Sequence, residues 1–136
     1  MAVFAFTDAS VTINSVDLSD HVRSVTLTLT SEELDTTAMS STGYRTRSGG
    51  LKDGSLSLEF NQDYASSEID ATFNGIIGTV VAFVVKPTSG SVSSTNPSYS
   101  GSVLITEYSP LANAVGDLAV ASMTFPTSGA TTRAVS

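Results

Sequence analysis

The chain has 136 residues, a formal net charge of −7 and no cysteine. This length suits one domain with one sizeable core, and the missing thiols exclude disulfides, thiolate metal sites and thiol catalysis. The negative charge opposes binding to nucleic-acid phosphates, which disfavours a conventional DNA-binding domain. Serine and threonine together make up 41 residues, and charged residues make up only 14% of the chain. This composition favours β-strands over a helical bundle or coiled coil.

Neither a secretory signal nor a membrane span is indicated. The first ten residues lack a basic start, and their apolar stretch ends at Phe6. The longest apolar run, at 80–85, is far too short to cross a bilayer as a helix. We therefore expect the chain to fold where it is made and not to insert into a membrane.

Several segments alternate between apolar and polar residues, which is the pattern of a strand with one buried face. Valine or leucine alternates with threonine over 25–30, and leucine or phenylalanine alternates with serine or glutamate over 55–60. Further predicted strands are 11–13, Val80–Lys86, 99–106 and 118–125. Six such strands predict an antiparallel β-sandwich or barrel.

One stretch has the periodicity of a helix. Ile69, Phe73, Ile76 and Ile77 recur at helical spacing after serines 66 and 67, either of which could be the N-cap, and Gly78 is the predicted terminator. This predicts one short α-helix that packs on the sheet.

Two long polar segments interrupt the strands. The first, 31–54 with its centre at about 34–51, is predicted to be a long loop, and loops of this length are usually functional. The second covers 88–98, and residues 127–136 are predicted to form a polar C-terminal tail.

His21, the only histidine, is the sole obvious candidate for acid–base or metal chemistry. Asp17 and Asp20 lie beside it in sequence and could be metal ligands or triad members. No catalytic motif accompanies them, so the favoured interpretation is a turn capped by short polar side chains. The glycines 43, 49 and 50 do not form a P-loop, and the acids 32, 33 and 35 are interpreted as a solvated flank. We predict no catalytic residue, no metal site and no cofactor.

The only basic cluster comprises Tyr44, Arg45, Arg47 and Lys52. In a chain of net charge −7, an arginine pair within a long polar segment suits contacts with acidic groups of another subunit. Solvation or ion pairing within the chain is the main alternative, and nucleic-acid binding is the weakest of the three.

Taken together, the chain resembles the major tail tube proteins of long-tailed (siphovirus-type) bacteriophages, particularly those that infect actinobacteria. The resemblance rests on an ordered series of segments: INSVDLSDHVRSVTL (13–27), GYRTRSGGLKDGSLSLEF (43–60), GTVVAFVVKPTSG (78–90), NPSYSGSVLITEYSPL (96–111) and GDLAVASMTFPTSG (116–129). Many relatives carry an additional immunoglobulin-like C-terminal domain, for which this sequence shows no counterpart.

The resemblance implies that residues 1–136 form a single tail tube domain, a β-sandwich flanked by a helix. Such subunits assemble into hexameric rings that stack into a hollow tube, through which double-stranded DNA passes without specific binding. The implied partners are further copies of the chain and the tape-measure, tail-tip and terminator proteins, and the implied location is the virion tail after synthesis in the host bacterial cytoplasm. In this family the segment matching 34–51 reaches a neighbouring subunit or ring.

A conduit for DNA must not retain it, so acidic groups are expected to line its wall. Glu59 and Asp117 are the predicted lumen-facing acids. The alternatives are a monomeric β-sandwich module that binds carbohydrate or another surface, a tail-tip or terminator subunit, and, third, an enzyme, which we do not expect.

Overall fold

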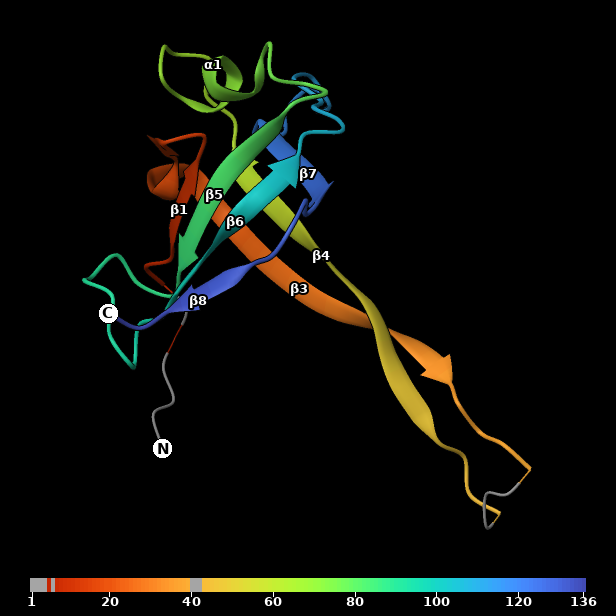
Figure 1. The fold of residues 1–136 in the computed structure, drawn as a ribbon. Coiled ribbons are helices and arrows are strands. Elements are labelled where there is room, and N and C mark those ends of the chain that lie inside the picture. The colour runs from red at the N-terminus through yellow and green to blue at the C-terminus, as the bar shows by residue number, and fades with distance from the viewer. Residues whose placement is uncertain (1–4, 6, 40–42) are drawn as a thin grey trace.

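The computed structural model describes residues 5, 7–39 and 43–136. Two antiparallel sheets pack face to face, and a short helix covers one end of the space between them (Figure 1). The predicted fold class, an antiparallel β-protein with one short flanking α-helix, is confirmed.

The larger sheet has the strand order β2-β1-β5-β6-β8. Its strands are β1 (Ser10–Ile13), β2 (Val16–Asp17), β5 (Val80–Lys86), β6 (Ser98–Leu104) and β8 (Thr132–Ala134). Strand β8 lies within the predicted polar C-terminal tail and pairs with residues 98–100 of β6. Backbone pairing rather than apolar burial forms this short edge strand, so the composition of the segment gives no signal for it.

The smaller sheet has the order β3-β4-β7, with β3 (Val22–Asp35), β4 (Arg47–Asn61) and β7 (Val120–Pro126). Leu27 pairs with Leu56, which pairs in turn with Phe125, so that apolar side chains of all three strands share one face. This face meets the larger sheet, and together they bury the core. The buried apolar residues are Val11, Ile13, Leu18, Leu56, Leu58, Phe60, Ile69, Phe73, Val81, Phe83, Val85, Val103, Ile105, Ala121, Met123 and Phe125.

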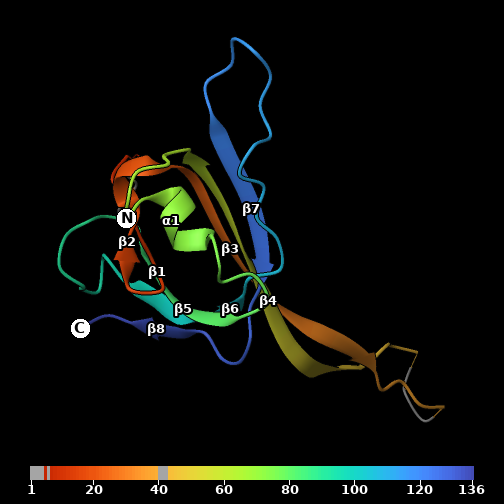
Figure 2. The ribbon, with the colours of Figure 1, turned by 90° about the horizontal axis from the view of Figure 1, so that it is seen from above.

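Helix α1 (Ile69–Phe73) lies over the end of the sandwich, as the view from above shows (Figure 2). The ring of its fully buried Phe73 lies 6.0 Å from that of Phe60 and 5.9 Å from that of Phe125, which anchors the helix to β4 and β7. The predicted boundaries are wrong at both ends. The N-cap is Glu68 without a side-chain hydrogen bond, and the helix ends before Gly75, whose φ of 93° cannot continue a right-handed helix.

The segment predicted as a loop at 34–51 is largely a two-stranded ribbon. Strands β3 and β4 pair as far as Asp35 and Arg47, and the ribbon projects from the body, away from the end that α1 covers (Figure 1). We call residues 31–52 the β-arm; residues 40–42 at its tip lie outside the described residues. Its described residues are exposed apart from the half-buried Gly50, and because both faces of the ribbon are wet, its sequence lacks the apolar alternation that reveals a half-buried strand.

Candidate functional site

The β-arm contains a ladder of alternating charges. Asp35 lies opposite Arg47 in the register. Arg47 forms an ion pair with Glu33, and Nη1 of Arg45 lies 3.2 Å from Oδ2 of Asp35. Because side chains alternate along a strand, these acids lie on the side of β3 that carries Val25, Leu27 and Leu29 within the body. Beyond the body no second sheet covers this side, which explains the change from apolar to charged residues.

Threonines hold the two strands together near the tip. The hydroxyls of Thr36 and Thr46 lie 2.9 Å apart, and the Thr46 amide donates to Oγ1 of Thr37 at 2.8 Å. The Thr37 hydroxyl and amide also lower the pKa of Asp35, which favours the charged form that pairs with Arg45. The ribbon is therefore ordered by local polar contacts without a core of its own.

The four residues predicted to contact other subunits all lie in the β-arm. Tyr44 and Arg45 lie near its tip, Arg47 begins β4, and Lys52 lies opposite Ser31 at the base. In the isolated chain both arginines pair with acids of the same hairpin, as in the alternative interpretation of ion pairing within the chain. The side chains of Tyr44, Leu51 and Met39 are exposed and apolar or aromatic, so the arm also offers contact area beyond its charges.

The solvent side of the smaller sheet forms a second candidate surface, which we call the hydroxyl face. Its members, fixed by the strand register, are Ser24, Thr26 and Thr28 of β3, Ser55, Ser57 and Glu59 of β4, and Ser122 and Thr124 of β7. The hydroxyls of Ser57 and Thr124 lie 2.8 Å apart. The face is therefore polar and made of short side chains.

Charges on the hydroxyl face are few. Glu59 forms an ion pair with Arg23 at 3.4 Å, where an extra residue in β3 brings the arginine beside it. A shallow pocket of about 310 Å³ on this face is lined in part by Glu59 and Glu107. Sequence reasoning missed Glu107 because it lies in the irregular segment after β6. Asp117 lies instead in an exposed turn of that segment, where its amide donates to the carbonyl of Ala114.

The outer edges of the smaller sheet form the third candidate surface. In the order β3-β4-β7, neither β3 nor β7 has a strand partner on its outer side within the part of the chain that the structure describes. Exposed strand edges can pair with another chain. On the core side of β3, the apolar row of Val25, Leu27 and Leu29 also lines an open groove of about 420 Å³, so this edge is incompletely covered.

Asp17 and His21, which are close in sequence, contact different groups in the structure. Asp17 accepts hydrogen bonds from the amide and hydroxyl of Ser19, which lower its pKa and support the start of the 3-10 turn η1 (Ser19–His21). A turn supported by a short polar side chain agrees with the favoured interpretation, although the N-cap residue itself, Leu18, makes no side-chain hydrogen bond. His21 instead contacts Glu68, and Asp63 and Asp20 lie nearby. Glu68 and Asp63 are 42 or more residues away from His21 in the sequence, so the sequence alone did not connect them with it.

No family model and no curated protein matches the chain. Solved structures do match. A chain from the virion of a native gene transfer agent particle is 21% identical with a TM-score of 0.74, covering 93% of this chain and 95% of that chain. A chain from the tail of an empty gene transfer agent particle, refined with C6 symmetry, is 23% identical with a TM-score of 0.64, covering 82% of this chain and 81% of that chain.

At this identity the comparisons establish a shared fold. The chain therefore has a tail-type β-sandwich fold, found in the virion and the tail of those particles. Among the described residues, no helix is long and apolar enough to cross a membrane.

Proposed function

We propose that the chain is a structural subunit of a tail tube, of the kind found in long-tailed bacteriophages, and that it assembles into stacked six-membered rings through which double-stranded DNA is delivered. The observation that carries this proposal is the match of 93% of the chain to a chain of a virion and of 82% of it to a chain of a sixfold-symmetric tail. A structural rather than catalytic role agrees with that likeness.

The free edges supply a mechanism for ring formation. Both pairings in β3-β4-β7 are antiparallel, so β3 and β7 run in the same direction. Rotation about an axis roughly along the strands preserves that direction, so β7 of one subunit would join β3 of the next as a parallel pair. Closed rotational symmetry then uses both edges of the smaller sheet and prevents its open-ended lateral growth.

The size of such a ring is consistent with a conduit. Six copies of a three-stranded sheet give an 18-stranded barrel. At a strand spacing of about 4.8 Å and a tilt of about 40°, its backbone diameter is roughly 36 Å. Because the apolar side of this sheet is buried in the core, the hydroxyl face would line the channel, and its short side chains leave room for a double helix.

The charge of the hydroxyl face suits passage of DNA without retention. Its cation Arg23 is paired with Glu59, and Glu107 adds negative charge nearby. Such a wall offers phosphates no unpaired cation. Asp117 remains a second proposed lumen acid. The β-arm, which projects from one end of the body, would contact the next ring through Tyr44, Arg45, Arg47 and Lys52.

Assembly is the property that tests this function. Purified protein should be imaged by negative-stain electron microscopy over a concentration series, alone and with a tail-tip complex as initiator, while its mass is measured in solution. Rings or hollow tubes with sixfold symmetry are the expected result. A monomer that stays monomeric in both conditions would contradict the tube and favour the alternative of a monomeric binding module.

A further inference from the structure

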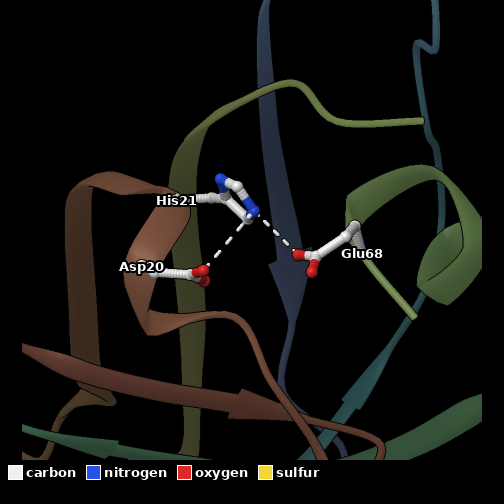
Figure 3. A group of neighbouring side chains, drawn as sticks. All are labelled: Asp20, His21 and Glu68. Carbon is white, nitrogen blue, oxygen red and sulfur yellow. Dashed lines mark hydrogen bonds and ion pairs between the residues drawn. The ribbon is translucent and has the colours of Figure 1, made fainter. Parts of the chain in front are cut away.

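Three carboxylates converge on one imidazole nitrogen beside α1. Nε2 of His21 lies 2.7 Å from Oε2 of Glu68, 3.3 Å from Oδ2 of Asp63 and 3.7 Å from Oδ2 of Asp20. Figure 3 shows Asp20 and Glu68 on either side of the ring. The four residues come from η1, the segment after β4 and the N-cap of α1, so the cluster joins parts of the chain that are distant in sequence.

The cluster holds more acidic groups than its imidazole can balance. One imidazole offsets at most one of the three carboxylates. Each described ion pair that involves an arginine uses another acid, namely Glu33, Asp35 or Glu59. Like charges held this close repel one another unless a cation lies between them.

The donor set is that of a metal site. Clustered surface carboxylates are common by themselves, but here an imidazole nitrogen, a preferred ligand of first-row transition ions, lies at their centre. The ligand atoms of Asp20, His21 and Glu68 lie within 4.8 Å of one another. Asp63 lies outside this group of three and adjoins it through the contact of its Oδ2 with Nε2 of His21. Metal–ligand distances of about 2.1 Å in a tetrahedral site place ligand atoms roughly 3.4 Å apart. The distances from Nε2 of 3.3 and 3.7 Å match that spacing, and Glu68 would move slightly outward.

Burial and support of the ligands also suit an ion. The His21 side chain is 20% exposed, those of Asp63 and Glu68 about a third, and that of Asp20 74%. Oδ1 of Asp63 accepts the amide of Ala65 at 2.9 Å, which fixes the carboxylate with Oδ2 toward the imidazole. Such support of a ligand by an outer hydrogen bond is typical of metal sites. The exposed Asp20 leaves a path by which an ion can enter.

We propose that Asp20, His21, Asp63 and Glu68 bind one divalent first-row transition ion such as Zn²⁺. The bound ion replaces repulsion between the carboxylates with shared coordination and ties α1 to η1. With Asp63 as the fourth ligand, no coordination position is left open for water or substrate, which makes the proposed site structural.

The test uses the full chain after treatment with a chelator. Co²⁺ is titrated while its visible absorption is recorded, since Zn²⁺ itself has no d-electron bands, and Zn²⁺ is then added as competitor. We expect saturation at one ion per chain, a Co²⁺ spectrum of tetrahedral type that Zn²⁺ abolishes, and a Tm that rises by several degrees with either ion.

Variants assign the binding to these residues. His21→Ala should abolish saturable binding, and the milder Glu68→Gln, which keeps the shape of the side chain, should weaken it at least tenfold. Glu32→Gln, which removes an exposed carboxylate of the β-arm, is the matched control and should bind like the wild type. Absence of saturable binding to the wild type, or equal binding by wild type and Glu68→Gln, would overturn the proposal. If His21→Ala fails to fold, the Glu68→Gln comparison decides alone.

Discussion

Gly75 shows how one residue limits an element. Isoleucines at 76 and 77 continue the helical spacing in the sequence, yet the helix ends at Phe73, because Asn74 is extended and Gly75 follows it with a φ of 93°. Ile76 still packs against the core, while Ile77 is exposed. Helical spacing thus identified the apolar residues of this segment but not the end of the helix, since a left-handed glycine interrupts the periodicity from within.

Gly75→Ala should lower the free energy of unfolding by about 1 kcal/mol, because a Cβ is strained in the left-handed region. Nothing lies within 4 Å of the position that the new Cβ would take, so backbone strain is the whole effect. Urea denaturation measures the change. Gly90→Ala is the control, since its backbone lies outside that region and the nearest atom is 3.6 Å away. Equal losses in both variants would show that strain at Gly75 is not the cause.

If the hydroxyl face lines the channel as proposed, Glu59→Lys should make it bind DNA, because the new lysine leaves Arg23 unpaired beside it. Tubes of this variant are expected to retain DNA with an affinity that falls steeply as salt rises, as measured by co-sedimentation. Glu32→Lys makes the same change of charge on the β-arm and should retain much less DNA. Similar retention by both variants would contradict a lumenal position for Glu59.

At the scale of elements, burial decided what the sequence could predict. The strands of the body alternate between core and solvent, so β5 was predicted with its observed bounds and β4 was predicted only over its body part, 55–60. Both faces of the β-arm are exposed to solvent, and β8 is held by backbone pairing with β6 rather than by apolar packing. Neither segment therefore has the apolar alternation by which strands are predicted from sequence. The site divides in the same way. The arginines of the arm stood out by composition, whereas the contacts of His21 with Asp63 and Glu68 depend on a fold that brings distant segments together.

Charge reversal in the β-arm, Arg45→Glu with Arg47→Glu, should block tube growth while the monomer stays folded, because the pairs with Asp35 and Glu33 become repulsive and any acid of a neighbouring subunit is repelled as well. Electron microscopy follows growth, and circular dichroism verifies the fold.

A fourfold variant separates the two effects. Adding Glu33→Arg and Asp35→Arg restores opposite charges within the hairpin. Positions 45 and 47 still carry negative charge toward the neighbouring subunit. If the neighbour supplies acids to Arg45 and Arg47, this variant should still fail to grow tubes. Recovery of tubes would mean that pairing within the arm is all that these residues provide.

At the scale of the whole molecule, the edges of the smaller sheet can be probed with introduced cysteines, because the chain has none of its own. Thr26 and Thr124 are separated by Ser57 of the central strand, so two strand spacings, about 10 Å, prevent a disulfide between them within one chain. In assembled Thr26→Cys/Thr124→Cys protein, oxidation should yield covalent oligomers no larger than six subunits, as seen on non-reducing gels.

Because the register between subunits can differ by a pair of residues, Ser24→Cys and Thr28→Cys are tested in place of Thr26→Cys. Each single-cysteine variant is the control and should not progress beyond a dimer. Tubes that form without crosslinking in any of the three combinations would exclude pairing of β3 with β7.

The register shift at the base of the β-arm determines where the arm points. Between the pairs Ser31 with Lys52 and Glu33 with Gly49, Gly50 and Leu51 lie opposite the single residue Glu32. Such a bulge bends and twists a ribbon. The direction of the arm thus depends on one surplus residue at its root, so removing Leu51, which is exposed, would swing the tip while leaving the residues of the tip unchanged. In a stacked assembly that angle fixes how far each ring is turned relative to the next, so the pitch of the tail would be encoded at this bend.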